Sequence, residues 1–150
     1  MKKASSAIRF GLVTSVMLIA YFLILSLFNK HTNPVFSFFN AAITAFGIWE
    51  AVRLSKLEQQ QKFSYSEGFR TGVVTGFTAT LLFTLFFLVY TTELNVAFLP
   101  ELLKTISGGF NASIGMVIFI VAIMGVATTV IATLTTMQFF KNSRNIPQNN

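Results

Sequence analysis

Four long apolar stretches, separated by shorter polar ones, set the pattern of the chain. They cover about residues 8–28, 35–54, 68–90 and 113–140. A helix needs about 20 mostly apolar residues to cross a hydrocarbon core about 30 Å thick. The pattern therefore predicts an all-α membrane protein, a four transmembrane helix bundle that forms a single domain over residues 1–150, with a polar cytoplasmic tail at 141–150.

The first stretch follows the basic residues Lys2, Lys3 and Arg9, as the core of a signal peptide would. Its apolar run is longer than a signal core of about 7–15 residues, and no small-residue cleavage site follows it. We therefore expect this stretch to be retained as a span.

A shorter amphipathic pattern lies between the third and fourth spans. The segment "FLPELLKTI" places apolar residues at helical spacing, Pro100 suits the first turn of a helix, and Gly108-Gly109 suits its end. Its apolar positions are Phe98, Leu99, Leu102, Leu103 and Ile106. We expect a short helix on the outer surface, with a partner-binding helix as the alternative.

Composition supports the membrane prediction and removes several kinds of site. The chain is 53% hydrophobic and 11% charged, whereas a soluble domain has about 25% charged residues. Cysteine is absent, which excludes disulfides and thiolate metal sites, and the one histidine, His31, is expected to be a solvated turn residue. We expect no metal, no cofactor and no nucleic-acid partner, since basic loops beside anionic lipid explain the net charge of +6.

The basic residues predict the orientation of the chain. All but two of its 11 lysines and arginines lie at the N-terminus, between the second and third spans, or in the tail, and these regions share one side of a four-span protein. The other side has Lys30 and Lys104. Because basic loops stay on the cytoplasmic side, both termini are expected to be cytoplasmic, in a bacterial inner membrane. The expected interface anchors are Arg53, Lys56, Lys62 and Arg70.

Small residues recur on one face of the third span at the four-residue spacing of a GxxxG pattern, which lets another helix approach closely. Packing inside the chain's own bundle is the first interpretation, and a homo-oligomer face is the alternative. Weaker patterns of the same kind occur in the other spans. The predicted helix-packing residues are Gly68, Gly72, Gly76, Thr80, Gly11, Ser15, Gly125 and Thr129.

The third span begins with a capping box, in which Ser64 stands three residues before Glu67. In the second span, Asn40 and Thr44 are the candidate intramembrane polar residues, and we expect Asn40 to form a hydrogen bond between helices. The five glutamates all lie at span ends or in loops, so no catalytic set is visible. We expect a non-enzymatic helix-packing component or accessory subunit of a membrane complex, with a small transporter or channel as the alternative.

Three segments carry a resemblance to a known family: "GIWEAVRL", "FSYSEGFRTG" and the aromatic run "FFLVY". The chain resembles a family of small bacterial integral membrane proteins with four predicted spans and no established function. The matching positions are Gly47, Ile48, Arg53, Ser64, Tyr65, Glu67, Gly68, Phe69 and Gly72. The resemblance implies the topology and brings no catalytic residues.

Overall fold

A computed structural model of the protein describes residues 2–59, 63–107 and 112–140, and these residues form helices and turns without a strand. The four long helices are α1 (Lys2–Leu27), α2 (Ser37–Gln59), α3 (Tyr65–Val89) and α5 (Ile114–Phe140). The short elements are the 3-10 turn η1 (Pro34–Phe36), the π-helical turn η3 (Tyr90–Leu94) and α4 (Phe98–Ser107).

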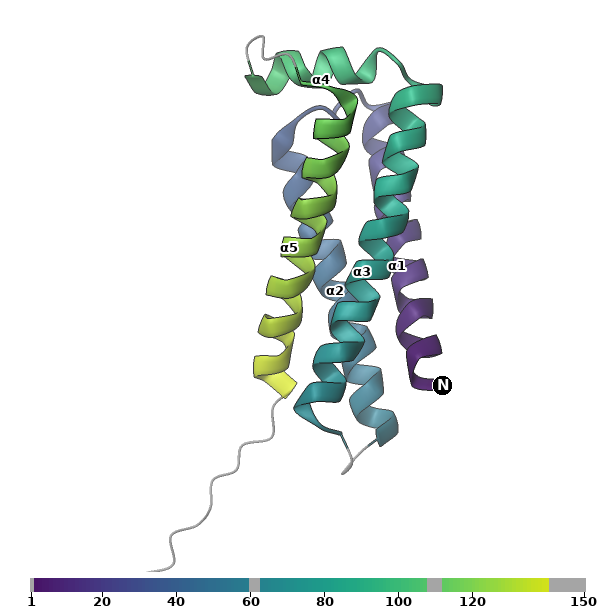
Figure 1. Ribbon diagram of the computed structural model, residues 1–150, viewed down its shortest axis with the longest axis vertical. Helices are drawn as coiled ribbons and strands as arrows, with labels where there is room; N and C mark the ends of the chain where they lie inside the picture. The colour runs from purple at the N-terminus through teal and green to yellow at the C-terminus, as the bar shows by residue number, and fades with distance from the viewer. Residues whose placement is uncertain (1, 60–62, 108–111, 141–150) are drawn as a thin grey trace, which may run out of the picture.

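The long helices lie side by side, and α4 lies crosswise over one end of them (Figure 1). Helices α1 and α3 run in one direction, and α2 and α5 run in the other. Each of α2 and α3 packs against all three of the other long helices. The centre of the bundle is therefore the α2–α3 pair, with α1 and α5 on its two sides.

Three helical segments of the described chain are long and apolar enough to cross a membrane: Ser5–Leu27, Tyr65–Leu94 and Ile114–Phe140. Helix α2 has sufficient length but is not among them, and its second half carries Glu50, Arg53, Lys56 and Glu58. The fold is that of a helical membrane protein, and the expected four spans are matched by three segments on length and composition. The predicted tail, residues 141–150, lies outside the described residues.

Local signals end α1 and begin α3. Asn29 adopts a left-handed conformation with φ 54°, and the amide of Lys30 donates to Leu25 O at 2.9 Å, which closes the last turn of α1. Ser64 is the N-cap of α3, and its hydroxyl accepts a hydrogen bond from the amide of Glu67 at 3.3 Å. This bond satisfies one of the free amides at the helix start.

The distribution of side chains is that of a bundle surrounded by lipid. Large apolar side chains such as Val16, Phe46 and Leu81 point outward, each more than half exposed. Many inward positions hold hydroxyl-bearing and small residues, beside buried apolar side chains such as Ile48 and Met137. Buried polar residues of the long helices are Thr14, Ser15, Thr44, Thr75, Thr80, Thr129, Thr133 and Thr136. Small residues at helix contacts are typical of membrane bundles, where close approach replaces the hydrophobic effect.

Candidate functional site

Glycines and threonines of α3 and α5 pack directly against one another. A Cβ atom added to Gly72 would lie 2.6 Å from Thr133 Cγ2, and one added to Gly76 would overlap Thr129. One turn further on the roles exchange, because Thr80 of α3 fills the space beside Gly125 of α5. We call this contact the Gly–Thr seam; its members are Gly72, Gly76, Thr80, Gly125, Thr129 and Thr133.

The seam continues toward the start of α3. Gly68 is buried against Met137 of α5 and the ring of Phe63. The three regularly spaced glycines of α3 thus face a helix of the same chain. Their lack of side chains brings the α3 and α5 backbones close together.

The same kind of contact joins α1 to its neighbours. Gly11 lies against Thr78 and the carbonyl oxygen of Thr75, and Gly47 of α2 lies against Thr14. The hydroxyl of Thr75 donates to Ala7 O at 3.1 Å, a buried hydrogen bond between α3 and α1. Ser15 is also buried, but its hydroxyl donates within α1, to Leu12 O at 2.7 Å.

A few buried polar atoms have no hydrogen-bond partner among the described residues. They include Asn40 Oδ1, Thr84 Oγ1 and Thr133 Oγ1. The bond from another helix expected at Asn40 is not formed at this oxygen; the main-chain oxygen of Asn40 accepts the hydroxyl of Thr44 at 2.9 Å within α2. An unmet buried group costs about 1–3 kcal/mol, so these positions are tolerated for packing or have a further role.

The predicted interface anchors differ in the contacts that their side chains make. Arg53 Nη1 lies 3.2 Å from both carboxylate oxygens of Glu50, an exposed pair that contributes little stability. Lys56 Nζ instead donates to Phe140 O at 3.1 Å and thereby satisfies a carbonyl at the end of α5. Arg70 is exposed on the first turns of α3, and Lys62 lies outside the described residues.

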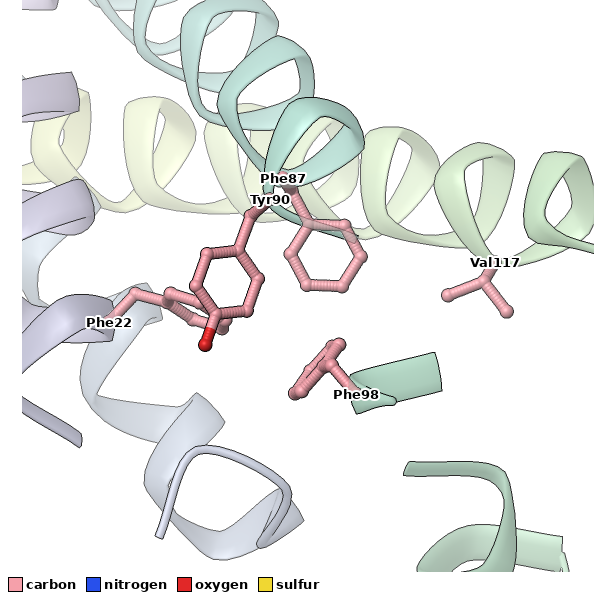
Figure 2. Packing of buried hydrophobic residues seen from close by; sticks show 5 residues of the cluster. All are labelled: Phe22, Phe87, Tyr90, Phe98 and Val117. Carbon is pink, nitrogen blue, oxygen red and sulfur yellow. The ribbon is translucent and has the colours of Figure 1, made fainter. Parts of the chain in front are cut away.

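An aromatic cluster closes the end of the bundle beneath α4. Figure 2 shows the rings of Phe22 from α1, Phe87 from the end of α3, Tyr90 from η3 and Phe98 from α4 turned toward one another. The ring centroids of Phe22 and Tyr90 are 4.9 Å apart, edge to face. Phe98 is 1% exposed, so the apolar side of α4 is used by the bundle itself. We call Phe22, Phe87, Tyr90, Phe98 and Val117 the outer cluster.

His31 also packs on the outer cluster, so the expectation of a solvated turn residue is wrong. Its imidazole stacks on Phe98 with centroids 4.8 Å apart, and neither ring nitrogen has a hydrogen-bond partner in the described structure. Burial lowers the pKa of His31 below its ordinary value of 6.5, and the negative charge of Glu101 offsets part of this shift. The turn is drawn inward because Phe22 and Phe98, far apart in the sequence, surround it.

A groove between α2 and α5 opens on the outer surface of the bundle, with a volume of about 610 Å³. The two helices line it with small and apolar side chains. They include Ala41, Ala45 and Trp49 of α2 and Ala132, Thr135 and Phe139 of α5. Sequence reasoning missed this groove, although the spacing of Ala41 and Ala45 on one face of α2 was a weak signal of it.

The described carboxylates give no sign of a metal centre. No group of three or more histidine, aspartate or glutamate residues in the described ranges is placed to hold a metal ion. Glu50, Glu58, Glu93 and Glu101 lie in the second half of α2, in η3 and in α4, near the ends of the bundle.

The geometry defines a helical membrane protein in which buried threonines pack against glycines of neighbouring helices. Residues 9–108 match a family described as proteins of unknown function (DUF4199). Because this match covers more than half of the chain, the chain belongs to that family, and the expected resemblance to a family of unknown function is confirmed at this level. No curated protein and no solved structure matches the chain.

Proposed function

We propose that the protein is a non-enzymatic, four-span bundle of a bacterial cytoplasmic membrane that acts as a packing component, or accessory subunit, of a larger membrane complex. The observation that carries this proposal is the Gly–Thr seam. Its polar side chains pack against glycines of the facing helix, and the hydroxyl of Thr129 donates to Gly125 O at 2.9 Å. Polar groups inside a membrane that serve packing support a structural role.

The direction of the helices supports α2 as the fourth span. Helices α1 and α3 are both apolar enough to cross the membrane, and they pack lengthwise in the same direction (Figure 1). Two parallel spans of one chain require a return path through the bilayer between them. Helix α2 supplies that path, with Gly47 and Ile48 buried against its neighbours and its charged residues at one end.

The charge distribution supports an orientation with both termini in the cytoplasm. Arg9 lies near the start of α1, and Arg53, Lys56 and Arg70 lie near the connection between α2 and α3, at the same end of the bundle. The opposite end has Lys30 and Lys104. This asymmetry has the sense required by the preference of basic loops for the cytoplasmic side.

The accessory-subunit proposal is tested by measuring the mass of the protein extracted from its native membrane in a mild detergent. We expect a stoichiometric assembly heavier than the 16.6 kDa chain. Gly72→Leu, which breaks the seam, should reduce the assembled fraction, whereas Gly115→Leu should leave it unchanged, because a Cβ there meets only Ser113 Oγ at 4.0 Å.

A second measurement separates this role from transport. The purified protein in liposomes should not increase the release of trapped ions or small solutes above that of empty liposomes. A monomer in the native membrane extract, combined with solute release that Thr133→Val abolishes, would contradict the proposal and favour the transporter class.

A further inference from the structure

The groove between α2 and α5 has the length of one membrane leaflet. Ala41 and Trp49, at its two ends, are about 12 Å apart along α2 at about 1.5 Å per residue, and Arg53 is about 18 Å from Ala41. One leaflet of a hydrocarbon core about 30 Å thick is about 15 Å deep. A single acyl chain lying along the groove would therefore end at the level of Arg53.

The groove leads to a basic hollow on the same pair of helices. Arg53, Lys56 and Leu57 of α2 line this second space with Phe140 of α5, and it has a volume of about 530 Å³. Trp49 marks the boundary, because its ring contacts Phe140 with centroids 4.7 Å apart. The apolar groove and the basic hollow thus follow one another from the membrane interior to its surface.

Arg53 and Lys56 have further N–H donors that can bind an anion in the basic hollow. Arg53 uses Nη1 for Glu50, and a guanidinium has five N–H donors in all. The ammonium of Lys56 has three donors, one of which binds Phe140 O. Glu50 cancels one of the two positive charges, so the hollow keeps a net positive charge that complements an anionic headgroup.

We propose that the α2–α5 groove binds one acyl chain of an anionic phospholipid whose phosphate is held by Arg53 and Lys56. The proposal rests on the four-span orientation proposed above, which places this end of the bundle in the cytoplasmic leaflet, where anionic lipids act on basic residues. The lipid fills the space between α2 and α5, and its phosphate is held by two side chains of α2, of which Lys56 also donates to Phe140 O at the end of α5.

Trp49 provides a direct test, because it is the only tryptophan of the chain and lines the groove. The full chain is reconstituted in vesicles that contain an equal small fraction of either phosphatidylglycerol or phosphatidylcholine with brominated acyl chains. We expect brominated phosphatidylglycerol to quench the fluorescence of Trp49 more strongly, and to saturate at a lower lipid fraction.

Variants separate the headgroup contact from the groove. Arg53→Gln and Lys56→Gln should each reduce the preference for the anionic lipid about fivefold, whereas Lys104→Gln, at the other end of the bundle, should not change it. Thr135→Leu fills the groove from an exposed position without changing any charge, and it should remove the preference as well.

Two results would overturn the proposal. Equal quenching by the two lipids would mean that Trp49 contacts bulk lipid alone. A preference that survives Thr135→Leu would mean that basic residues enrich anionic lipid around the protein without a bound chain in the groove. Neither result depends on whether the protein has a protein partner. If a cysteine placed at Arg53 were labelled from the outer side of the membrane, the orientation on which the proposal rests would be wrong.

Discussion

The hydroxyl oxygens of Thr80 in α3 and Thr129 in α5 lie 3.5 Å apart, buried at the centre of the Gly–Thr seam. Each threonine covers a glycine of the opposite helix, Gly125 or Gly76. Each of the two antiparallel helices therefore contributes one glycine and one threonine to this contact, one turn apart. This reciprocity means that a change on one side of the seam has a defined compensating change on the other.

Gly72→Ala should destabilise the bundle, and Thr133→Ala should restore it. The added Cβ would lie 2.6 Å from Thr133 Cγ2 and 2.8 Å from its hydroxyl oxygen. Such overpacking costs about 1–3 kcal/mol, more than the gain of up to about 1 kcal/mol from alanine's helix propensity. Thermal unfolding in detergent measures both variants. Gly115→Ala, where the added Cβ meets only Ser113 Oγ at 4.0 Å, is the matched control. Failure of the double variant to recover stability would contradict the contact.

Thr133→Val should leave stability unchanged or raise it by about 1 kcal/mol. The hydroxyl of Thr133 is fully buried without a hydrogen-bond partner in the described structure, and valine keeps its shape while removing that unmet group. Thr129→Val should be destabilising in the same assay, because it loses the bond to Gly125 O. A clear loss of stability in Thr133→Val would show that this hydroxyl has a partner.

The stability of the outer cluster should fall as the pH is lowered from 7 to 5. Because burial holds the pKa of folded His31 below 6.5, the unfolded chain binds more protons in this range, and the free energy of unfolding therefore decreases. Tyr90 and Glu101 also face His31. His31→Phe should flatten this pH dependence of stability in thermal unfolding. If the slope of stability against pH were unchanged in this variant, another group would be responsible for the pH dependence.

Phe98→Ala should release α4 from the end of the bundle. Truncation of a fully buried phenylalanine costs about 3–5 kcal/mol, and Phe98 joins α4 to Phe22, Phe87 and Tyr90. Limited proteolysis should then cut near α4 much faster than in the unaltered protein. The control variant Val96→Ala, changed at an exposed position beside Phe98, should be cut at the original rate. Equal protection of Phe98→Ala would show that other contacts hold α4.

Single cysteines at Ser5 and Val96 should be labelled from opposite sides of the membrane, and cysteines at Ser5 and Ser64 from the same side. The chain has no cysteine of its own, so each label is unambiguous. All three positions are exposed. If α2 did not cross the bilayer, α3 would be inserted in the reverse direction, and Ser5 and Val96 would share a side. Impermeant maleimide labelling of sealed cells distinguishes the two topologies.

Much of this fold follows from patterns along the chain. Apolar runs and the "SYSE" cap place the long helices and the start of α3 close to where they lie, since both signals are local. The amphipathic spacing around Phe98 likewise predicts α4. The number of spans is harder to predict, because α2 combines an apolar half with a charged half, and its proposed place as the fourth span rests on its direction relative to α1 and α3.

Contacts between distant segments were harder to predict. The glycine spacing of α3 marks a contact face, but nothing local indicates that Thr129 and Thr133 cover it. His31 stands in a polar turn, and its burial depends on Phe98, which is far away in the sequence. The α2–α5 groove likewise depends on how Ala45 and Ala132 face each other, a relation that exists only after the helices have packed.

The threonines of this bundle also bear on how it enters the membrane. The hydroxyls of Thr14, Thr44, Thr78 and Thr129 each donate to the carbonyl four residues earlier in the same helix, at 2.8–2.9 Å. A lone helix in lipid must satisfy its own polar groups, and these bonds need no second helix. These four hydroxyls are therefore satisfied before any two helices meet, whereas Thr80 bonds only across to α5 and Thr133 has no partner in the described structure. For the four, insertion of the helix need not wait for assembly.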